Sequence, residues 1–195
     1  MAGSAVSCAG TSACRATKGY LGISPGTSIT GKWVTGKNYS KKQVRTTKSN
    51  ACAKDGLAAW KKGRSLSGKS LASGALGGKT FTPGVYRSSG ALTISPASGK
   101  VYLDAKGNSN AKFIFYAKTT LTTAARTQIV LKNGARAANV YWILGTAATL
   151  GADSILRGTL LAGSAITIGS NGIIYGRAIA QTAVTCAKAC TVSKF

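Results

Sequence analysis

Between Leu103 and Ala180 the chain repeats one short unit, in which an apolar, strand-like run is followed by Gly, Asn or Asp and then by another such run. The runs read LDAKGNSNAKFIF, LTTAARTQIVLKNG, NVYWILGTAATLG, SILRGTLLAG, SAITIGSNG and IIYGRAIA. Each is too short and too often interrupted by Gly to be a helix, and β-branched residues dominate. Short strands at close, regular intervals predict a β-solenoid, in which each coil buries its inward side chains against the next.

One segment has a different pattern, because the stretch that begins at Ser40 lacks Pro and is rich in helix-forming residues. Ala53, Leu57 and Trp60 fall at i, i+4 and i+7, which predicts one narrow apolar stripe on an otherwise basic helix. Ser40 is a suitable N-cap and Gly63 a suitable C-terminal stop. We therefore expect a helix over about residues 40–64, packed alongside the solenoid.

The Ser/Gly-rich connection after this helix leads back into strands, with no sign of a second domain. The expected fold is mainly β, a single solenoid domain over residues 1–195 with one α-helix at its side. A chain of 195 residues is long enough to bury roughly 70% of its unfolded surface in one such domain.

The charge balance is extreme, because 26 Lys and Arg residues face only Asp55, Asp104 and Asp153, with no Glu and no His. A net charge of +23 exceeds the roughly 2–8 units that keep a small domain soluble. This excess predicts an acidic protein neighbour or a polyanion as partner; nucleic acid would be bound without sequence specificity and in a salt-sensitive way. The candidate basic patch consists of Lys41, Lys42, Arg45, Lys48, Lys61, Lys62, Arg126, Lys132, Arg157 and Arg177.

The N-terminal sequence MAGSAVSCAG has no apolar run of signal-peptide length, and no apolar stretch of about 18 residues occurs anywhere. We therefore expect no membrane span. The sequence favours a protein used inside a cell or within a virus particle, or a secreted one if a signal has been removed. The sequon Asn38-Tyr39-Ser40 matters only in the secreted case.

Five cysteines lie towards the two ends and in the first third of the chain, so at least one of them is unpaired or is paired between chains. Cys8, Cys14, Cys186 and Cys190 are candidates for disulfides, but spacing alone does not assign the pairing. Small buried thiols in a reducing compartment are the alternative. The Cx5C and Cx3C spacings are poor for a four-cysteine zinc site, so no metal is expected.

Catalysis is poorly supported, because the usual general bases His and Glu are missing. Asp104 and Asp153 lie in turn-like contexts, where Asp commonly hydrogen-bonds its own backbone. Residues 63–70 fit the pattern GxxxxGK[ST], but a phosphate-binding loop needs a strand before it and a helix after it. Here a helix is expected before it. We predict no enzyme activity and no cofactor.

Five ordered motifs cover most of the chain: LGISPGTSITG (21–31), FTPGVYRSSGALTI (81–94), LDAKGNSNAKFIF (103–115), NGARAANVYWILGTAATLG (133–151) and GTLLAGSAITIGSNGIIYGRAIA (158–180). With the helix inserted after the first coils, they closely resemble the microbial ice-binding proteins of the discontinuous β-solenoid type. The resemblance implies a right-handed β-helix of triangular cross-section with one α-helix along a side. It also implies that the terminal coils interleave with later ones.

This chain departs from that family in its strong positive charge and in its start, where relatives carry further strand residues and a secretion signal. It also places Arg126, Lys132 and Arg157 at positions that resemble face residues. Ammonium and guanidinium groups hold hydration water and do not match an ice lattice. We therefore expect a charged face that disfavours ice and docks on carboxylates or phosphates instead.

Ice binding would need a flat face of small residues with regularly spaced threonines. Aligning LTT (121–123), ATL (148–150), ITI (166–168) and VTC (184–186) puts them at one level of successive coils. Strand alternation then points Leu121, Leu150, Ile166, Ile168 and Val184 inward. The outward ladder consists of Thr122, Thr149, Thr167 and Thr185, with Thr93 as an extension.

Two interpretations follow. In the first, which the sequence favours, the solenoid is a non-catalytic structural protein, a basic block held in a larger assembly such as a virus capsid or virion shell. In the second, the chain is an ice-binding (antifreeze) protein that acts through the threonine ladder. Threonine is also simply a good strand residue, so the ladder alone does not decide between them.

Overall fold

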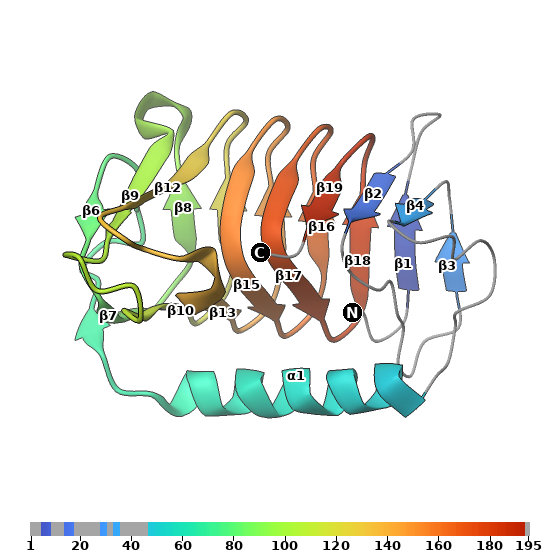
Figure 1. The fold of residues 1–195 in the computed structure, drawn as a ribbon, viewed down its shortest axis with the longest axis horizontal. Helices are drawn as coiled ribbons and strands as arrows, with labels where there is room; N and C mark the ends of the chain where they lie inside the picture. Colours follow the sequence, from blue (N-terminus) through green and yellow to red (C-terminus); the bar gives the residue numbers. More distant parts are fainter. Residues whose placement is uncertain (1–4, 9–13, 18–27, 31–32, 36–46, 194–195) are drawn as a thin grey trace.

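The computed structural model describes residues 5–8, 14–17, 28–30, 33–35 and 47–193, with side chains for residues 54–193. The strands stack in parallel as successive coils, and α1 (Thr47–Ser65) lies along the stack (Figure 1). The predicted β-solenoid with one helix is confirmed. Among the described residues, no helix combines the length and the apolarity needed to cross a membrane.

One side of the solenoid is a seven-stranded parallel sheet. In spatial order its strands are β3 (Ser28–Thr30), β1 (Ala5–Cys8), β18 (Ala183–Cys186), β16 (Ile166–Ile168), β14 (Ala148–Leu150), β11 (Leu121–Thr123) and β8 (Leu92–Ile94). The N-terminal strands β1 and β3 therefore continue the sheet beyond the C-terminal strand β18 (Figure 1). The first coils of the chain therefore stack on its last coil.

The other two sides are formed by a twelve-stranded sheet. Its main path runs through β4 (Trp33–Thr35), β2 (Cys14–Thr17), β19 (Thr191–Ser193), β17 (Ile173–Ala180), β15 (Ile155–Ala162), β13 (Val140–Leu144), β10 (Phe113–Ala117), β7 (Gly84–Ser88) and β5 (Lys69–Ser70). Its branch holds β12 (Gln128–Lys132), β9 (Lys100–Asp104) and β6 (Thr80–Phe81), and the 3-10 turns η1 (Pro96–Ser98) and η2 (Ala137–Asn139) lie in connections.

The long strands β15 and β17 belong to both of these sides. The first half of β15 pairs with β12 and its second half pairs with β13. At the junction Gly158 has a φ of +120°, and a Cβ there would lie 2.6 Å from the carbonyl oxygen of Val140. Glycine is needed at this bend because both the backbone angle and the close approach exclude a side chain. We call the side formed by β6, β9, β12 and the first halves of β15 and β17 the second face.

Inside the coils, residues of the same kind stack on one another in successive strands. Tyr86, Phe115 and Trp142 occupy one register position, with ring centroids 5.3 Å apart for the first pair and 4.5 Å for the second. Phe81 packs edge-on against Tyr86 and Phe115. All four rings are buried, so the aromatic residues are concentrated in the early coils of the core.

Helix α1 covers the third side, which consists of β7, β10, β13 and the second halves of β15 and β17. Its contact stripe is Gly56, Trp60 and Gly63, and the Trp60 Nε1–H donates to the carbonyl oxygen of Leu144 at 2.7 Å. Of the predicted apolar stripe, Trp60 lies at the contact, Leu57 is wrong because it is 38% exposed, and Ala53 lies outside the part described with side chains. The predicted stop at Gly63 is also wrong, because the helix continues to Ser65. Residues 40–46 lie outside the described residues.

A bulky side chain at Gly63 is expected to destabilise the fold, because a Cβ there would collide with Cδ1 of Ile143. Gly63→Leu should lower the free energy of unfolding by about 1–3 kcal/mol, the usual cost of overpacking. Thermal unfolding followed by circular dichroism measures this. Ala59→Leu, at an exposed position on the same helix, is the matched control and should change stability by at most about 0.5 kcal/mol. Equal losses in the two variants would contradict this packing.

Asp104 holds the corner between the second face and the helix-covered side. Its Oδ1 accepts the Lys106 backbone N–H and the Asn133 Nδ2–H, each at 2.8 Å. These two bonds, with a smaller contribution from the Lys106 charge, lower the pKa of Asp104 below its ordinary value despite burial of the carboxyl. The expected turn role of this aspartate is therefore seen in the structure.

This lowered pKa predicts a pH dependence of stability. The folded state stabilises the ionised carboxylate of Asp104 more than the unfolded state does. Its contribution to stability is therefore complete above the ordinary Asp pKa and is lost as pH falls through the pKa of the folded state. Asp104→Asn should reduce the melting temperature at neutral pH and flatten its fall in acid. With three acidic side chains in the whole chain, melting temperature against pH can resolve one of them. An unchanged acid limb in the variant would refute the assignment.

Candidate functional site

The five threonines of the predicted ladder meet on the seven-stranded sheet. Thr93 pairs with Thr122, Thr122 with Thr149, Thr149 with Thr167, and Thr167 with Thr185. The first four are exposed and Thr185 is half-buried, while the residues immediately before and after each threonine are buried. We call this row the threonine ladder. Parallel strands place its members about 4.8 Å apart along the solenoid axis.

The ladder continues in register past the C-terminal coil. Ser7 of β1 pairs with Thr185, and Thr30 of β3 pairs with Ser7. Both are hydroxyl residues at the backbone position that the ladder occupies in the later coils. The row of hydroxyl residues therefore spans all seven strands of the sheet.

Small residues flank the ladder on both sides. The column before it holds Ala91, Thr120, Ala147, Ala165 and Ala183, and the column after it holds Ser95, Ala124, Gly151, Gly169 and Ala187. Backbone hydrogen bonds keep both columns in register, for example from Ala148 N–H to the Ala165 oxygen at 2.9 Å and from Gly169 N–H to the Leu150 oxygen at 2.8 Å. Because no bulky side chain stands beside the ladder, the surface around it is flat. We call the three columns together the threonine face.

A second row of hydroxyl residues runs along the corner where each coil enters this face. Thr146 N–H donates to the Thr119 oxygen at 2.9 Å, and Ser164 N–H donates to the Thr146 oxygen at 2.9 Å. Thr182 extends the row by a bond to Ser164 at 3.2 Å. The sequence prediction missed this row. Its signal is the four-residue repeat [T/S]-x-x-T in residues 119–122, 146–149, 164–167 and 182–185.

The expectation of a charged face is wrong for the described coils. None of the residues that form the threonine face in β8, β11, β14, β16, β18 and their flanking columns is Lys or Arg. Arg126 lies in the turn that follows the face, with a φ of +60°, and Asp153 and Asn171 hold the same turn position in the next coils. Lys132 and Arg157 lie on the second face instead.

There, each of these two charges is engaged with neighbouring groups. Lys132 Nζ lies 4.1 Å from the Tyr102 ring centroid, and the Arg157 guanidinium lies 5.4 Å from that of Tyr175. An Arg157 Nη1–H also donates to the carbonyl oxygen of Ile129. Cation–π contacts and this hydrogen bond hold both side chains against the sheet.

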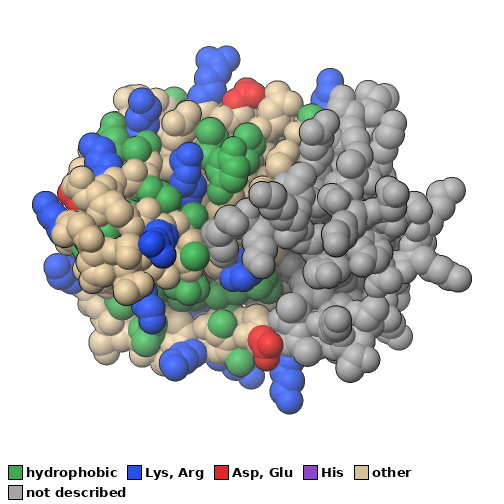
Figure 2. Space-filling model, in the orientation of Figure 1, with side chains coloured by type: hydrophobic (Ala, Val, Ile, Leu, Met, Phe, Trp, Pro, Cys, Tyr) green, Lys and Arg blue, Asp and Glu red, His purple; other side chains and the backbone are tan. Residues whose placement is uncertain are grey.

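The candidate basic patch does not form one surface. Lys61 and Lys62 are exposed on α1, Arg177 is exposed on β17, and the other described members lie in a turn or on the second face. Lys and Arg side chains are scattered over the coloured, described part of the face shown in Figure 2. The remaining members lie outside the part described with side chains: Lys41, Lys42, Arg45 and Lys48.

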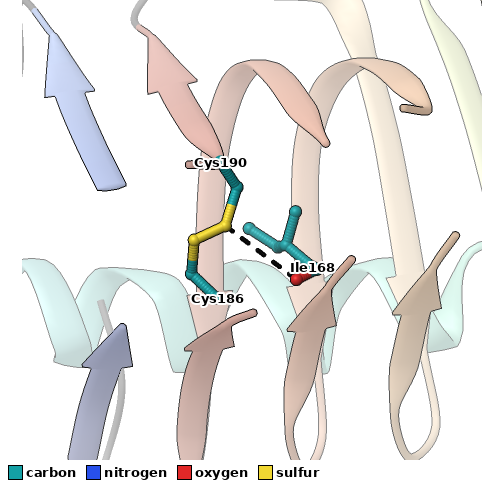
Figure 3. Close-up of a disulfide and its surroundings, with 3 residues drawn as sticks. All are labelled: Ile168, Cys186 and Cys190. Atoms are coloured by element: carbon teal, nitrogen blue, oxygen red, sulfur yellow. Dashed lines mark hydrogen bonds between the residues drawn. A yellow bond between two sulfur atoms is a disulfide. The ribbon is translucent and has the colours of Figure 1, made fainter. Parts of the chain in front are cut away.

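Cys186 and Cys190 form a disulfide that closes the turn after β18 (Figure 3). Their Cα atoms are 6.0 Å apart, and Cys190 Sγ lies 3.9 Å from the carbonyl oxygen of Ile168 in the preceding coil. Both residues are buried. This bond fixes the edge of the threonine face at the last coil before the chain's N-terminal strands.

The structure shows the context of the phosphate-loop pattern over residues 63–70. The pattern begins in the last turn of α1 and ends in the two-residue strand β5, the reverse of the strand–loop–helix order that phosphate binding needs. Among the described residues, no group of three or more His, Cys, Asp or Glu side chains is placed to hold a metal ion.

Comparison with known proteins agrees with this architecture. The family model described as Ice-binding-like matches residues 1–192. An ice-binding protein of Nostoc sp. (strain HG1) is 37% identical over 147 residues, which is 73% of this chain and 51% of that protein. One of Flavobacterium frigoris (strain PS1) is 36% identical over 47% of this chain and 32% of that protein. The chain thus spans about half or less of the length of these two relatives.

Solved structures agree over nearly the whole chain. The ice-binding protein of the Antarctic ascomycete Antarctomyces psychrotrophicus superposes with a TM-score of 0.87 at 32% identity, covering 99% of this chain and 92% of that one. An ice-binding protein from an Antarctic biological consortium gives a TM-score of 0.88 at 31% identity, covering 98% and 85%. Both of these structures are named ice-binding proteins.

These findings contradict the interpretation of the chain as a structural block in a capsid or virion shell. The relatives and structures reported above are all named ice-binding proteins, and the family model covers the chain almost from end to end. Positive charge had favoured the assembly, but charge is a property of the surface and not of the fold. The chain belongs to the Ice-binding-like family.

Proposed function

We propose that this protein binds ice through the threonine face. The observation that carries the proposal is the threonine ladder itself, five threonines in unbroken register on one sheet. Each threonine offers a hydroxyl that donates and accepts hydrogen bonds and a methyl that excludes loose water. Repetition at the strand spacing can hold water molecules in a regular array, as a crystal surface requires.

The surroundings of the ladder support the same function. Flanking Ala, Gly and Ser residues leave the hydroxyls level with their neighbours, and the described part of the face carries no cationic group that would bind water in its own geometry. Stacked coils also resist the twist of an ordinary sheet, and side-chain ladders help to keep such sheets flat. A flat crystal plane needs a flat counterpart.

Thermal hysteresis and ice-crystal shaping on the purified chain test this proposal. We expect faceted crystals and a measurable hysteresis gap, both retained at high ionic strength, because the face works without charge. Lys61→Glu with Lys62→Glu, at exposed positions on α1, is the matched charge control and should leave both readouts unchanged. A folded protein that neither shapes ice nor shows hysteresis would overturn the proposal. Loss of activity in the charge-reversed variant would assign the activity to the basic surface.

A further inference from the structure

Cys8 and Cys14 stand in register with the two cysteines of the observed disulfide. Cys8 of β1 pairs with Cys186 of β18. Arg15 of β2 pairs with Thr191 of β19, so Cys14 lies one step before Arg15 as Cys190 lies one step before Thr191. The first coil therefore repeats, at the same corner, the cysteine positions of the last coil.

We propose that Cys8 and Cys14 form a second disulfide, stacked on the Cys186–Cys190 bond at this corner. Parallel pairing carries the Cα positions of one coil onto the next, so the Cys8–Cys14 separation follows the 6.0 Å found for Cys186 and Cys190. Disulfides form at Cα separations of about 4.4–6.8 Å. The segment between Cys8 and Cys14 has two more residues than that between Cys186 and Cys190, and the strands that carry the two cysteines keep the register of the last coil.

Comparison with earlier coils shows what this bond replaces. At the equivalent corner the Thr127 hydroxyl donates to the Ala124 oxygen at 3.1 Å, and the Ser154 hydroxyl donates to the Gly151 oxygen at 2.6 Å. Thr127, Ser154, Gly172 and Cys190 follow one another in register, since each following residue bonds to the carbonyl of the previous coil. The closing hydrogen bond of the earlier coils is thus replaced by a covalent bond.

The replacement occurs where the two ends of the chain meet. Strands β18 and β19 belong to the C-terminal coil, whereas β1 and β2 belong to the N-terminal coil that stacks on it. These two coils are not consecutive in the chain, so no short backbone connection holds them in line. Each coil needs its own bond across the corner turn to fix its shape. A disulfide in each would keep Ser7 in line with Thr185 and preserve the ladder across this junction.

Formation of the bond is a two-electron oxidation. The two thiols lose two protons and two electrons by exchange with a small-molecule disulfide such as oxidised glutathione, which is reduced to two thiols. With two pairs formed among five cysteines, Cys52 of α1 is left as the single free thiol.

Tryptic mapping of the air-oxidised chain, alkylated without reduction, tests the pairing. Cys8 and Cys14 fall in one tryptic peptide, residues 1–15, whereas Cys186 and Cys190 fall in peptides 178–188 and 189–194. We expect peptide 1–15 to be unalkylated and lighter by two hydrogens than its reduced form, and to gain two alkyl groups after reduction. Alkylation of that peptide before reduction, or a link from it to peptide 178–188 or to the Cys52 peptide, would overturn the proposal.

Thiol titration of the denatured, unreduced chain gives an independent measurement. The wild type should show one free thiol, Cys52→Ser none, and Cys8→Ser two. Three free thiols in the wild type would mean that only the Cys186–Cys190 bond forms, and would refute the second disulfide. Neither measurement uses ice, so failure here leaves the proposed function untouched.

Discussion

Tyrosine at Thr149 and Thr167 together is expected to remove nearly all thermal hysteresis from this protein while its melting temperature stays the same. These two threonines pair directly and occupy the middle of the threonine ladder. Two phenol rings standing above the Ala and Gly columns would hold an ice surface away from the remaining hydroxyls. Both positions are exposed, so the change in folding free energy should stay within about 0.5 kcal/mol.

A control substitution shows whether the loss depends on the position of the tyrosine or on the tyrosine side chain itself. Thr80→Tyr places the same side chain at an exposed strand threonine on the second face and should leave hysteresis intact. Ice-crystal shape and the hysteresis gap are measured for both variants, with circular dichroism to verify the fold. Full activity in the double tyrosine variant would exclude the threonine face as the ice-binding site.

The ladder could be predicted from sequence because its pattern is local. In LTI, ATL and ITI a threonine stands between two apolar residues, and strand alternation alone turns it outward. Spacing between coils then aligns one threonine with the next. The corner row with Thr119 and Thr146 was missed because its residues lie in turns, where alternation no longer tells which way a side chain faces.

The distribution of charge could not be predicted in the same way. Arg126 can be assigned to a face by counting along the coil only if the length of the preceding turn is known. An error of one residue turns a side chain from one face of the strand to the other. In the structure Arg126, Asp153 and Asn171 all have a left-handed backbone at the same position of the corner turn, so Arg126 belongs to the turn and not to the face. A composition-based argument gives the number of charges but not the face on which they lie.

The contact stripe of the helix was predicted only in part, in Trp60, for a different reason. Apolar periodicity selects Leu57, yet α1 approaches the sheet through Gly56 and Gly63, which have no side chain to register in a hydrophobicity pattern. The side chains that lie opposite these two glycines come from the sheet, Ile179 at Gly56 and Ile143 at Gly63. The glycines let the helix approach the sheet closely, and the side chains that fill the space opposite them come from residues far away in sequence. A local hydrophobicity pattern therefore does not show this contact.

Truncation of Trp142 is expected to cause the largest loss of stability among single substitutions in the core. The side chain is fully buried, its ring lies 4.5 Å from that of Phe115, and its Nε1–H donates to the Arg157 oxygen at 2.9 Å. Trp142→Ala removes the stack, leaves a cavity and leaves that carbonyl without its donor. The free energy of unfolding should fall by about 3–5 kcal/mol, measured by chemical denaturation.

Trp142→Phe separates the contribution of the aromatic stack from that of the indole hydrogen bond. Phenylalanine retains most of the stack and forfeits the hydrogen bond, so we expect a cost of about 1–3 kcal/mol, below that of alanine. Ice shaping near the freezing point should persist in both variants if they remain folded there, because Trp142 lies inside the solenoid and the threonine face lies outside it. A loss of under about 1 kcal/mol for Trp142→Ala would mean that the aromatic stack does not hold these coils together. Lost ice activity in a folded Trp142→Phe protein would instead show that the packing of the core sets the flatness of the face.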